Sequence, residues 1–107
     1  NIPPEAVSIF NKLKKNAYDI RIPQMAANYF FDMKIVLKSF KKHLKPNSVV
    51  CIDIGDSIYN KVHIPTDEIL IDISKNLKFD FVEDILLRKR LSHSKKPLSQ
   101  KLIVLRT

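Results

Sequence analysis

The stretch Ser48–Thr66, SVVCIDIGDSIYNKVHIPT, contains an apolar run that ends at Gly55, the only glycine in the chain. This run is apolar on both faces until Asp53, a pattern typical of a strand that helices cover above and below. Asp56 and Ser57 follow the glycine directly. Ligands of open α/β sheets gather where strands reach their carboxyl ends, so we expect the functional site at this turn.

A single glycine also excludes whole classes of site. Phosphate-cradling loops need several residues of permissive backbone, and neither a G-x-G-x-x-G pattern nor a P-loop is present in this sequence. If the chain belongs to an enzyme with a nucleotide cofactor, the cofactor loop lies elsewhere.

The length and composition indicate one globular domain over residues 1–107. With 107 residues and 45% hydrophobic side chains, the chain can form one core but not two. No apolar run approaches the roughly 20 residues of a membrane helix, and the amino end lacks a signal-peptide pattern, so we expect a cytoplasmic protein with no membrane partner. The absence of a starting Met suggests a piece of something longer. The sole cysteine, Cys51, is predicted to be a buried, unreactive thiol.

A net charge of +8 and a pI near 9.7 favour a polyanionic partner. Lysines between positions 34 and 45 are interpreted as the solvated face of a helix. A second cluster is the better candidate for phosphate contact, with a merely solvated loop as the alternative. It comprises Arg88, Lys89, Arg90, Lys95 and Lys96 around Ser92, His93 and Ser94.

Hydrophobic periodicity predicts three helices and three strands. The helices cover residues 3–16, 25–43 and 66–77, with Thr66 as the cap of the last one. The strands cover residues 48–54, 79–88 and 101–105. Residues 16–24, 56–63 and 91–99 are predicted to be loops.

This order predicts how the two functional loops meet. A strand-helix-strand crossover leaves its strands parallel, and the short connection to the last strand favours an antiparallel return. Parallel strands would place the loops 56–63 and 91–99 at one edge of the sheet, so the acidic turn and the basic cluster would face the same cleft. The alternative is that they are unrelated surface loops.

The residues from Met25 onward resemble the carboxyl-terminal half of a class I S-adenosylmethionine-dependent methyltransferase. The resemblance rests on L-K-P-N before a strand that runs into I-G-D-S, then V-H-I-P-T-D, R-K-R-L-S-H-S and K-L-I-V-L-R. Within that superfamily it is most similar to the amino-methylating DNA methyltransferases of restriction-modification systems. Asn47 and Ser48 replace the glycines that usually follow L-K-P, a mild departure because asparagine tolerates positive φ.

This resemblance implies an α/β fold with a partial Rossmann-like methyltransferase sheet and flanking helices. Residues 44–54, 79–88 and 101–106 would form the fifth, sixth and seventh strands, the seventh lying antiparallel between the other two. S-adenosylmethionine would be the cofactor of the parent protein, although its binding loop is absent from this chain. The loop between the sixth and seventh strands would contact DNA, and Asp56 and Ser57 would form the pocket rim. The implied nucleic-acid-binding residues are Arg88, Lys89, Arg90, Ser92, His93 and Ser94.

The catalytic residues of that family are not found in this chain. Asn1-Ile2-Pro3-Pro4 superficially resembles the catalytic Asp/Asn/Ser-Pro-Pro-aromatic tetrapeptide, but Ile2 intrudes and Glu5 replaces the aromatic ring that stacks on the target base. Val50 before Cys51 rules out the Pro-Cys nucleophile of ring-carbon cytosine methyltransferases. We therefore predict a chain that is inactive alone and contributes the target-side wall of the parent enzyme.

Other interpretations stay open at the level of sequence. His43, His63 and His93 are too scattered for a recognisable metal site, and none is assigned. Asp56 has a structural alternative, in which it satisfies backbone donors in a tight turn. RNA is the alternative substrate, and a non-catalytic basic nucleic-acid-binding or assembly module is the alternative class. The expected partners are DNA, the missing amino-terminal methyltransferase half and, through the exposed edge of the first strand, a second copy.

Overall fold

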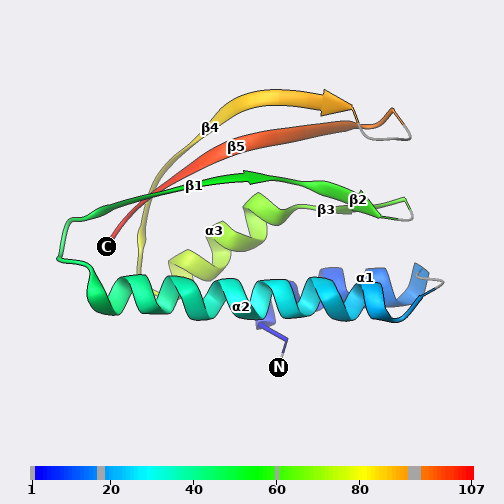
Figure 1. Cartoon of the computed structure of the whole chain (residues 1–107), viewed down its shortest axis with the longest axis horizontal. Coiled ribbons are helices and arrows are strands. Elements are labelled where there is room, and N and C mark those ends of the chain that lie inside the picture. The colour runs from blue at the N-terminus through cyan, green and yellow to red at the C-terminus, as the bar shows by residue number, and fades with distance from the viewer. Residues whose placement is uncertain (1, 17–18, 60, 92–94) are drawn as a thin grey trace.

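A computed structural model describes residues 2–16, 19–59, 61–91 and 95–107 as a group of helices beside one main sheet (Figure 1). The elements in order are η1 (Pro4–Ala6), α1 (Val7–Asn16), α2 (Arg21–His43), β1 (Val49–Gly55), β2 (Ser57–Tyr59), β3 (Val62–Ile64), α3 (Thr66–Asn76), β4 (Asp80–Leu91) and β5 (Pro97–Arg106). Within the described residues, no helix combines the length and apolarity that crossing a bilayer requires.

The main sheet has the strand order β1-β5-β4, and β5 is antiparallel to both neighbours. Consequently β1 and β4 run in the same direction with β5 between them, as the expected crossover and antiparallel return require. The register places Ile103 of β5 between Ile52 of β1 and Asp84 of β4. The mixed helix and sheet content of the α/β prediction is therefore observed. Neighbouring strands in the described sheet are all antiparallel, so the sheet does not support the expected Rossmann-like parallel arrangement.

Within the part of the chain that the structure describes, helices cover only one face of this sheet, so the prediction of cover on both sides is wrong. Helix α3 contacts β1, β4 and β5, and Val50, Ile103 and Leu105 are buried on the covered side. Alternate residues of β1 point the other way, and Val49 and Cys51 are exposed. The expectation of a buried Cys51 is wrong for the same reason. Strand side chains alternate between two faces, and here one of those faces lacks a covering helix.

The core lies between α3, the covered sheet face and the helix pair α1 and α2. Its buried members are Ala6, Ile9, Leu13, Phe30, Leu37, Val50, Ile69, Leu70, Ile73, Phe79, Ile103 and Leu105. The predicted stripe of α3 is confirmed, because Ile69, Leu70 and Ile73 are buried. The stripe predicted for α2 is largely wrong: of its members only Leu37 is buried, and Phe30, which was not assigned to it, is buried as well. Its exposed members are Tyr29, Val36, Phe40 and Leu44.

Helix α2 begins at Arg21, four residues earlier than its predicted start. The Asp19 carboxylate accepts hydrogen bonds from the Arg21 backbone amide at 3.0 Å and from the Arg21 guanidinium at 2.8 Å. Pro23 lies in the first turn, where a proline breaks no helical hydrogen bond. The polar and proline-containing segment that predicted a loop is thus partly a helix start.

A two-stranded hairpin, β2 and β3, occupies most of the predicted loop 56–63. Ser57 pairs with Ile64 and Tyr59 pairs with Val62. Lys61 in the turn adopts a φ of 67°, the left-handed region that tight turns often require. Strands of three residues are too short to produce a recognisable alternation of apolar and polar residues, so the sequence did not predict this hairpin.

Strands β4 and β5 are longer than predicted, and they extend into the loop that was expected at residues 91–99. Their ladder runs from Asp80 opposite Arg106 to Leu91 opposite Pro97. Arg88 lies on a strand as predicted, and Lys89 and Arg90, beyond the predicted end, lie on the same strand. Pairing between the two strands orders a segment whose charged side chains alone indicated loop.

Of two further expectations about turns, one is wrong and one agrees with the structure. Thr66 begins α3 without capping it, and its hydroxyl donates to the Ile64 carbonyl oxygen at 3.4 Å. Asn47 has a φ of 66°, in line with the expected tolerance of asparagine for that region.

Candidate nucleic-acid interface

The centre of the candidate site is Asp56, which follows the end of β1. Its backbone amide donates to the Ser99 carbonyl oxygen at 3.1 Å, and its carboxylate oxygen Oδ1 accepts the Ser99 amide at 2.7 Å. These two bonds attach the carboxyl end of β1 to the start of β5. The structural role considered for Asp56, satisfying a backbone donor, is therefore present.

The second carboxylate oxygen of Asp56 bonds to His63 on β3, a residue that sequence analysis did not assign to this site. Asp56 Oδ2 and His63 Nε2 are 2.5 Å apart. An ionised carboxylate only accepts hydrogen bonds, so Nε2 is the donor. The Asp56 side chain is 11% exposed and that of His63 is 51% exposed. The β2–β3 hairpin brings the two residues together, and the sequence carries no clear signal of that hairpin.

Electrostatics favour the charged form of Asp56. Burial raises the pKa of Asp56, but hydrogen bonds from His63 and from the Ser99 amide outweigh it and hold the pKa below its ordinary value of 3.8. The turn therefore presents a fixed negative charge at neutral pH.

Arg90 reaches from β4 across β5 to the same turn. Its Nη2 atom donates to the Asp56 carbonyl oxygen at 3.0 Å. A Cβ atom added to Gly55 would lie 2.6 Å from that nitrogen, so glycine leaves room for the guanidinium. Arg90 Nε is buried without a hydrogen-bond partner among the described residues. The expected meeting of the acidic turn with the basic cluster is confirmed for this pair.

Arg88 belongs to a row of hydrogen-bonded side chains on the uncovered face of the sheet. Its Nε atom donates to Gln100 Oε1 at 2.9 Å, and Gln100 Nε2 donates to Asp53 Oδ1 at 2.7 Å. Each of the three strands supplies one member of this row. The Arg88 side chain is exposed, and a guanidinium carries further donors on its terminal nitrogens. Lys89 is exposed and lies between the two arginines on β4.

The remaining predicted residues divide into two groups. Ser57 lies in β2 and lines an apolar pocket instead of the charged turn. Ser92, His93 and Ser94, which the resemblance assigned to DNA contact, lie outside the described residues.

The apolar pocket that contains Ser57 has a volume of about 420 Å³ and lies beside the carboxyl end of β1. Helix α2 contributes Met25, Tyr29 and Phe30 to it, and β1 contributes Ile54 and Gly55. Met25 is 63% exposed, so this wall is largely open to solvent.

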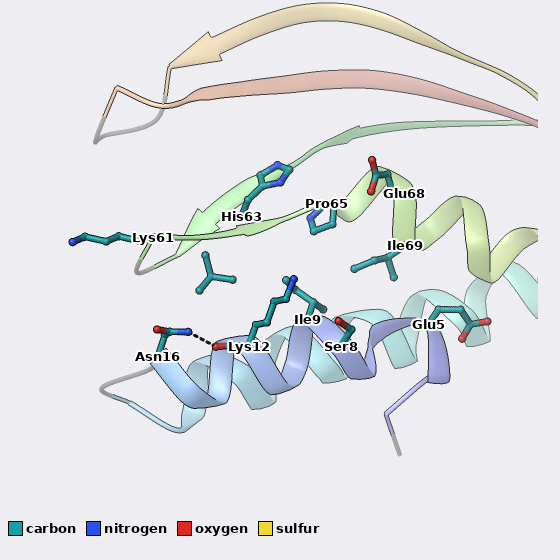
Figure 2. Close-up of a pocket in the computed structure, with 11 residues that line it drawn as sticks. Glu5, Ser8, Ile9, Lys12, Asn16, Lys61, His63, Pro65, Glu68 and Ile69 are labelled. Atoms are coloured by element: carbon teal, nitrogen blue, oxygen red, sulfur yellow. Dashed lines mark hydrogen bonds between the residues drawn. The ribbon is translucent and has the colours of Figure 1, made fainter.

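A second cleft, of about 500 Å³, lies between α1 and β3 (Figure 2). Its charged lining is mixed, with Lys12 and Lys61 on one hand and Glu5 and Glu68 on the other. The imidazole of His63 points to the side of the hairpin away from α1 in this view. His63 is nevertheless one of the residues that line the cleft, so it connects the cleft with the Asp56 turn.

Glu5, at the position where the catalytic tetrapeptide would need an aromatic ring, connects three helices. Its Oε2 atom accepts a hydrogen bond from Asn76 at the end of α3 at 2.7 Å, and Lys34 of α2 approaches Oε1 at 3.9 Å. The Glu5 side chain is 6% exposed. Its contacts are those of a structural residue.

Neither a metal-binding cluster nor a glycine-rich turn is found among the described residues. No cluster of three or more His, Cys, Asp or Glu side chains within the described ranges could hold a metal ion. The single glycine, Gly55, has no positive φ and faces Arg90, so it does not supply the glycine-rich turn that the methyl donor needs. We therefore derive no chemical step through that cofactor from this chain.

Comparison with known proteins gives no relative from which a function could be transferred. No family model matches the chain, and searches of curated proteins and of solved structures found no significant match.

Proposed function

We propose that this chain is part of an S-adenosylmethionine-dependent DNA methyltransferase that modifies an exocyclic amino group of adenine or cytosine. The observation that carries the proposal is the strand order β1-β5-β4, in which an antiparallel last strand separates two strands of common direction. The resemblance assigns these strands as fifth, seventh and sixth, which is the same order.

The position of the charged residues supports a role on the target side of the enzyme. Arg90 contacts the turn after β1. Arg88 lies near this turn on the uncovered face of the sheet, and Lys89 lies between the two arginines on the outer strand β4. Guanidinium and ammonium groups suit phosphate oxygens, and such contacts position a protein on nucleic acid without reading its sequence. In this proposal, Asp56 and Ser57 border the pocket and do not take the proton.

The chemistry is proposed to come from an amino-terminal half of the parent protein. An exocyclic amine conjugated to a base ring is a poor nucleophile, and it needs acceptors on the amine and a ring that stacks on the extruded base. The free edge of β1, next to the apolar pocket around Met25 and Tyr29, is the surface to which we assign that missing half.

The test is the modification of nucleic acid by the complete gene product. It is expressed in a bacterial host without endogenous DNA methylation, and hydrolysed DNA and RNA are then analysed by mass spectrometry for bases methylated on the exocyclic amine. We expect one such base in DNA, and none when the 107-residue chain is expressed alone.

Two outcomes would contradict this function. A modified base found only in RNA would favour the RNA methyltransferase alternative. No modified base in either nucleic acid, together with salt-dependent DNA binding and no binding of the methyl donor, would favour a non-catalytic basic module.

A further inference from the structure

Strand β4 is an outer strand of the sheet with an unusually apolar exposed surface. Among the described residues it pairs only with β5, and in Figure 1 it is the strand farthest from the helices. Its exposed apolar side chains are between 41% and 71% accessible to solvent. They are Val82, Ile85, Leu86, Leu87 and Leu91. An open edge with this composition invites pairing with another strand.

The charges of β4 are divided between its two halves. The acidic residues Asp80, Glu83 and Asp84 precede the apolar centre Ile85–Leu87, and Arg88, Lys89 and Arg90 follow it. Two such strands placed antiparallel would bring the acidic half of each beside the basic half of the other. A parallel arrangement would place like charges together, which is unfavourable.

We infer that the β4 edge is a docking surface for a second copy of this chain, related to the first by a two-fold axis near Leu86. The interface is isologous, so every favourable charge contact occurs twice. The other sheet edge, on β1, carries a single charged residue, Asp53, and has no such complementarity. This distinguishes the β4 edge from the β1 edge, which the sequence alone had suggested.

Two irregularities in the backbone of β4 explain why side-chain charge decides how two β4 strands would pair. The register with β5 shifts between Phe81 and Glu83 and again between Leu86 and Arg88. Bulges of this kind interrupt the backbone hydrogen bonds that an edge strand can offer. With only short regular runs available, the backbone discriminates poorly between registers, and the side-chain charges decide the orientation.

The decisive experiment is a charge exchange on β4, followed by sedimentation equilibrium of the whole chain. Glu83 and Arg88 lie on the same face of the sheet, because their β5 partners Val104 and Gln100 do. Glu83→Lys makes the charged ends of β4 more alike, and Arg88→Glu does the same with the opposite sign. Neither residue has a charge contact within the described structure, whereas Asp84 pairs with Lys101 and Arg90 bonds to Asp56. We expect each variant alone to self-associate about tenfold more weakly than the wild type, because both symmetry-related contacts become repulsive.

Mixing the two variants provides the sharper readout. An equimolar mixture of Glu83→Lys and Arg88→Glu chains should form a heterodimer at a concentration where each variant alone is monomeric. Lys38→Glu on the exposed surface of α2 is the matched control and should dimerise like the wild type. Circular dichroism verifies that each variant is folded.

A wild-type chain that remains monomeric at millimolar concentration would overturn the inference. So would variants that dimerise as strongly as the wild type, since another surface would then hold the copies together. These measurements use neither DNA nor methyl donor, so their outcome is read separately from that of the proposed methyltransferase function, although the interface and the proposed DNA contact share Arg88 and Lys89.

Discussion

At the scale of single residues, the turn after β1 depends on the fit between Gly55 and Arg90. The guanidinium occupies the space that a Cβ would need, and from there it reaches the Asp56 carbonyl oxygen. A steric reason for the only glycine in the chain is therefore visible, although its φ is not positive.

Gly55→Ala should destabilise the chain by about 1 kcal/mol, because the methyl group displaces the Arg90 guanidinium and its hydrogen bond. In an Arg90→Met background, Gly55→Ala should lower the free energy of unfolding much less, since the flexible Met side chain can move away from the added methyl group. Urea unfolding of the two single variants and the double variant measures this coupling. Equal costs of Gly55→Ala in both backgrounds would show that the two residues are not coupled.

Asp56 should make the chain sensitive to acid. Its folded pKa lies below the ordinary value of 3.8, so its contribution is present at higher pH and is lost as the pH falls through the folded pKa. The stability of the wild type should therefore fall more steeply than that of Asp56→Asn below about pH 4.

Urea unfolding at a series of pH values measures this difference in slope. Asp32→Asn, which makes the same chemical change on the exposed surface of α2, is the control and should retain the wild-type acid response. Identical slopes for the wild type and Asp56→Asn would exclude a stabilising carboxylate at this turn.

At the scale of secondary-structure elements, the main finding is a sheet with one covered face. Val49 and Val50 are neighbours of the same type in β1, but Val49 is 54% exposed and Val50 is 8% exposed. They form a natural matched pair, because the same Val→Ala truncation is made at neighbouring positions of one strand that face opposite sides of the sheet.

Val50→Ala should lower the free energy of unfolding by about 2 kcal/mol, through lost burial and the resulting cavity. Val49→Ala should cost less than about 0.5 kcal/mol, as is usual for exposed positions. Chemical denaturation followed by circular dichroism measures both values. Similar large costs at both positions would mean that the outer face of β1 is also covered in solution.

At the scale of the whole molecule, the net charge of +8 is expected to govern binding to nucleic acid. If the carboxyl end of β4 contacts phosphates, its cations should contribute to the salt dependence individually. Exposed lysines on the far helices should contribute little.

The double variant Arg88→Ala/Lys89→Ala should lower the slope of log K against log salt concentration by about 2 in duplex DNA binding, since each lost phosphate contact removes about 0.9. Fluorescence anisotropy over a range of salt concentrations measures this slope. Lys14→Ala/Lys15→Ala in the last turn of α1 removes the same charge and should leave the slope nearly unchanged. Equal losses in both double variants would indicate a diffuse charge effect without a defined contact surface.

The order of helices and strands followed from local patterns in the sequence. The helical spacing of Tyr29, Met33 and Leu37 predicted α2, and the apolar run before Gly55 predicted β1, because each pattern is the one its element needs for a buried face. The direction of β4 relative to β1 followed from the crossover rule.

Tertiary structure alone decided the details of the site. The β2–β3 hairpin brings His63 to Asp56, and pairing with β5 extends β4 as a strand through Arg90. The exposure of Cys51 also depends on which sheet face α3 covers. Local sequence patterns indicate which side chains each segment can bury. These features depend instead on contacts between segments that are distant in the chain, and the free energy of such contacts cannot be inferred from any short stretch of sequence.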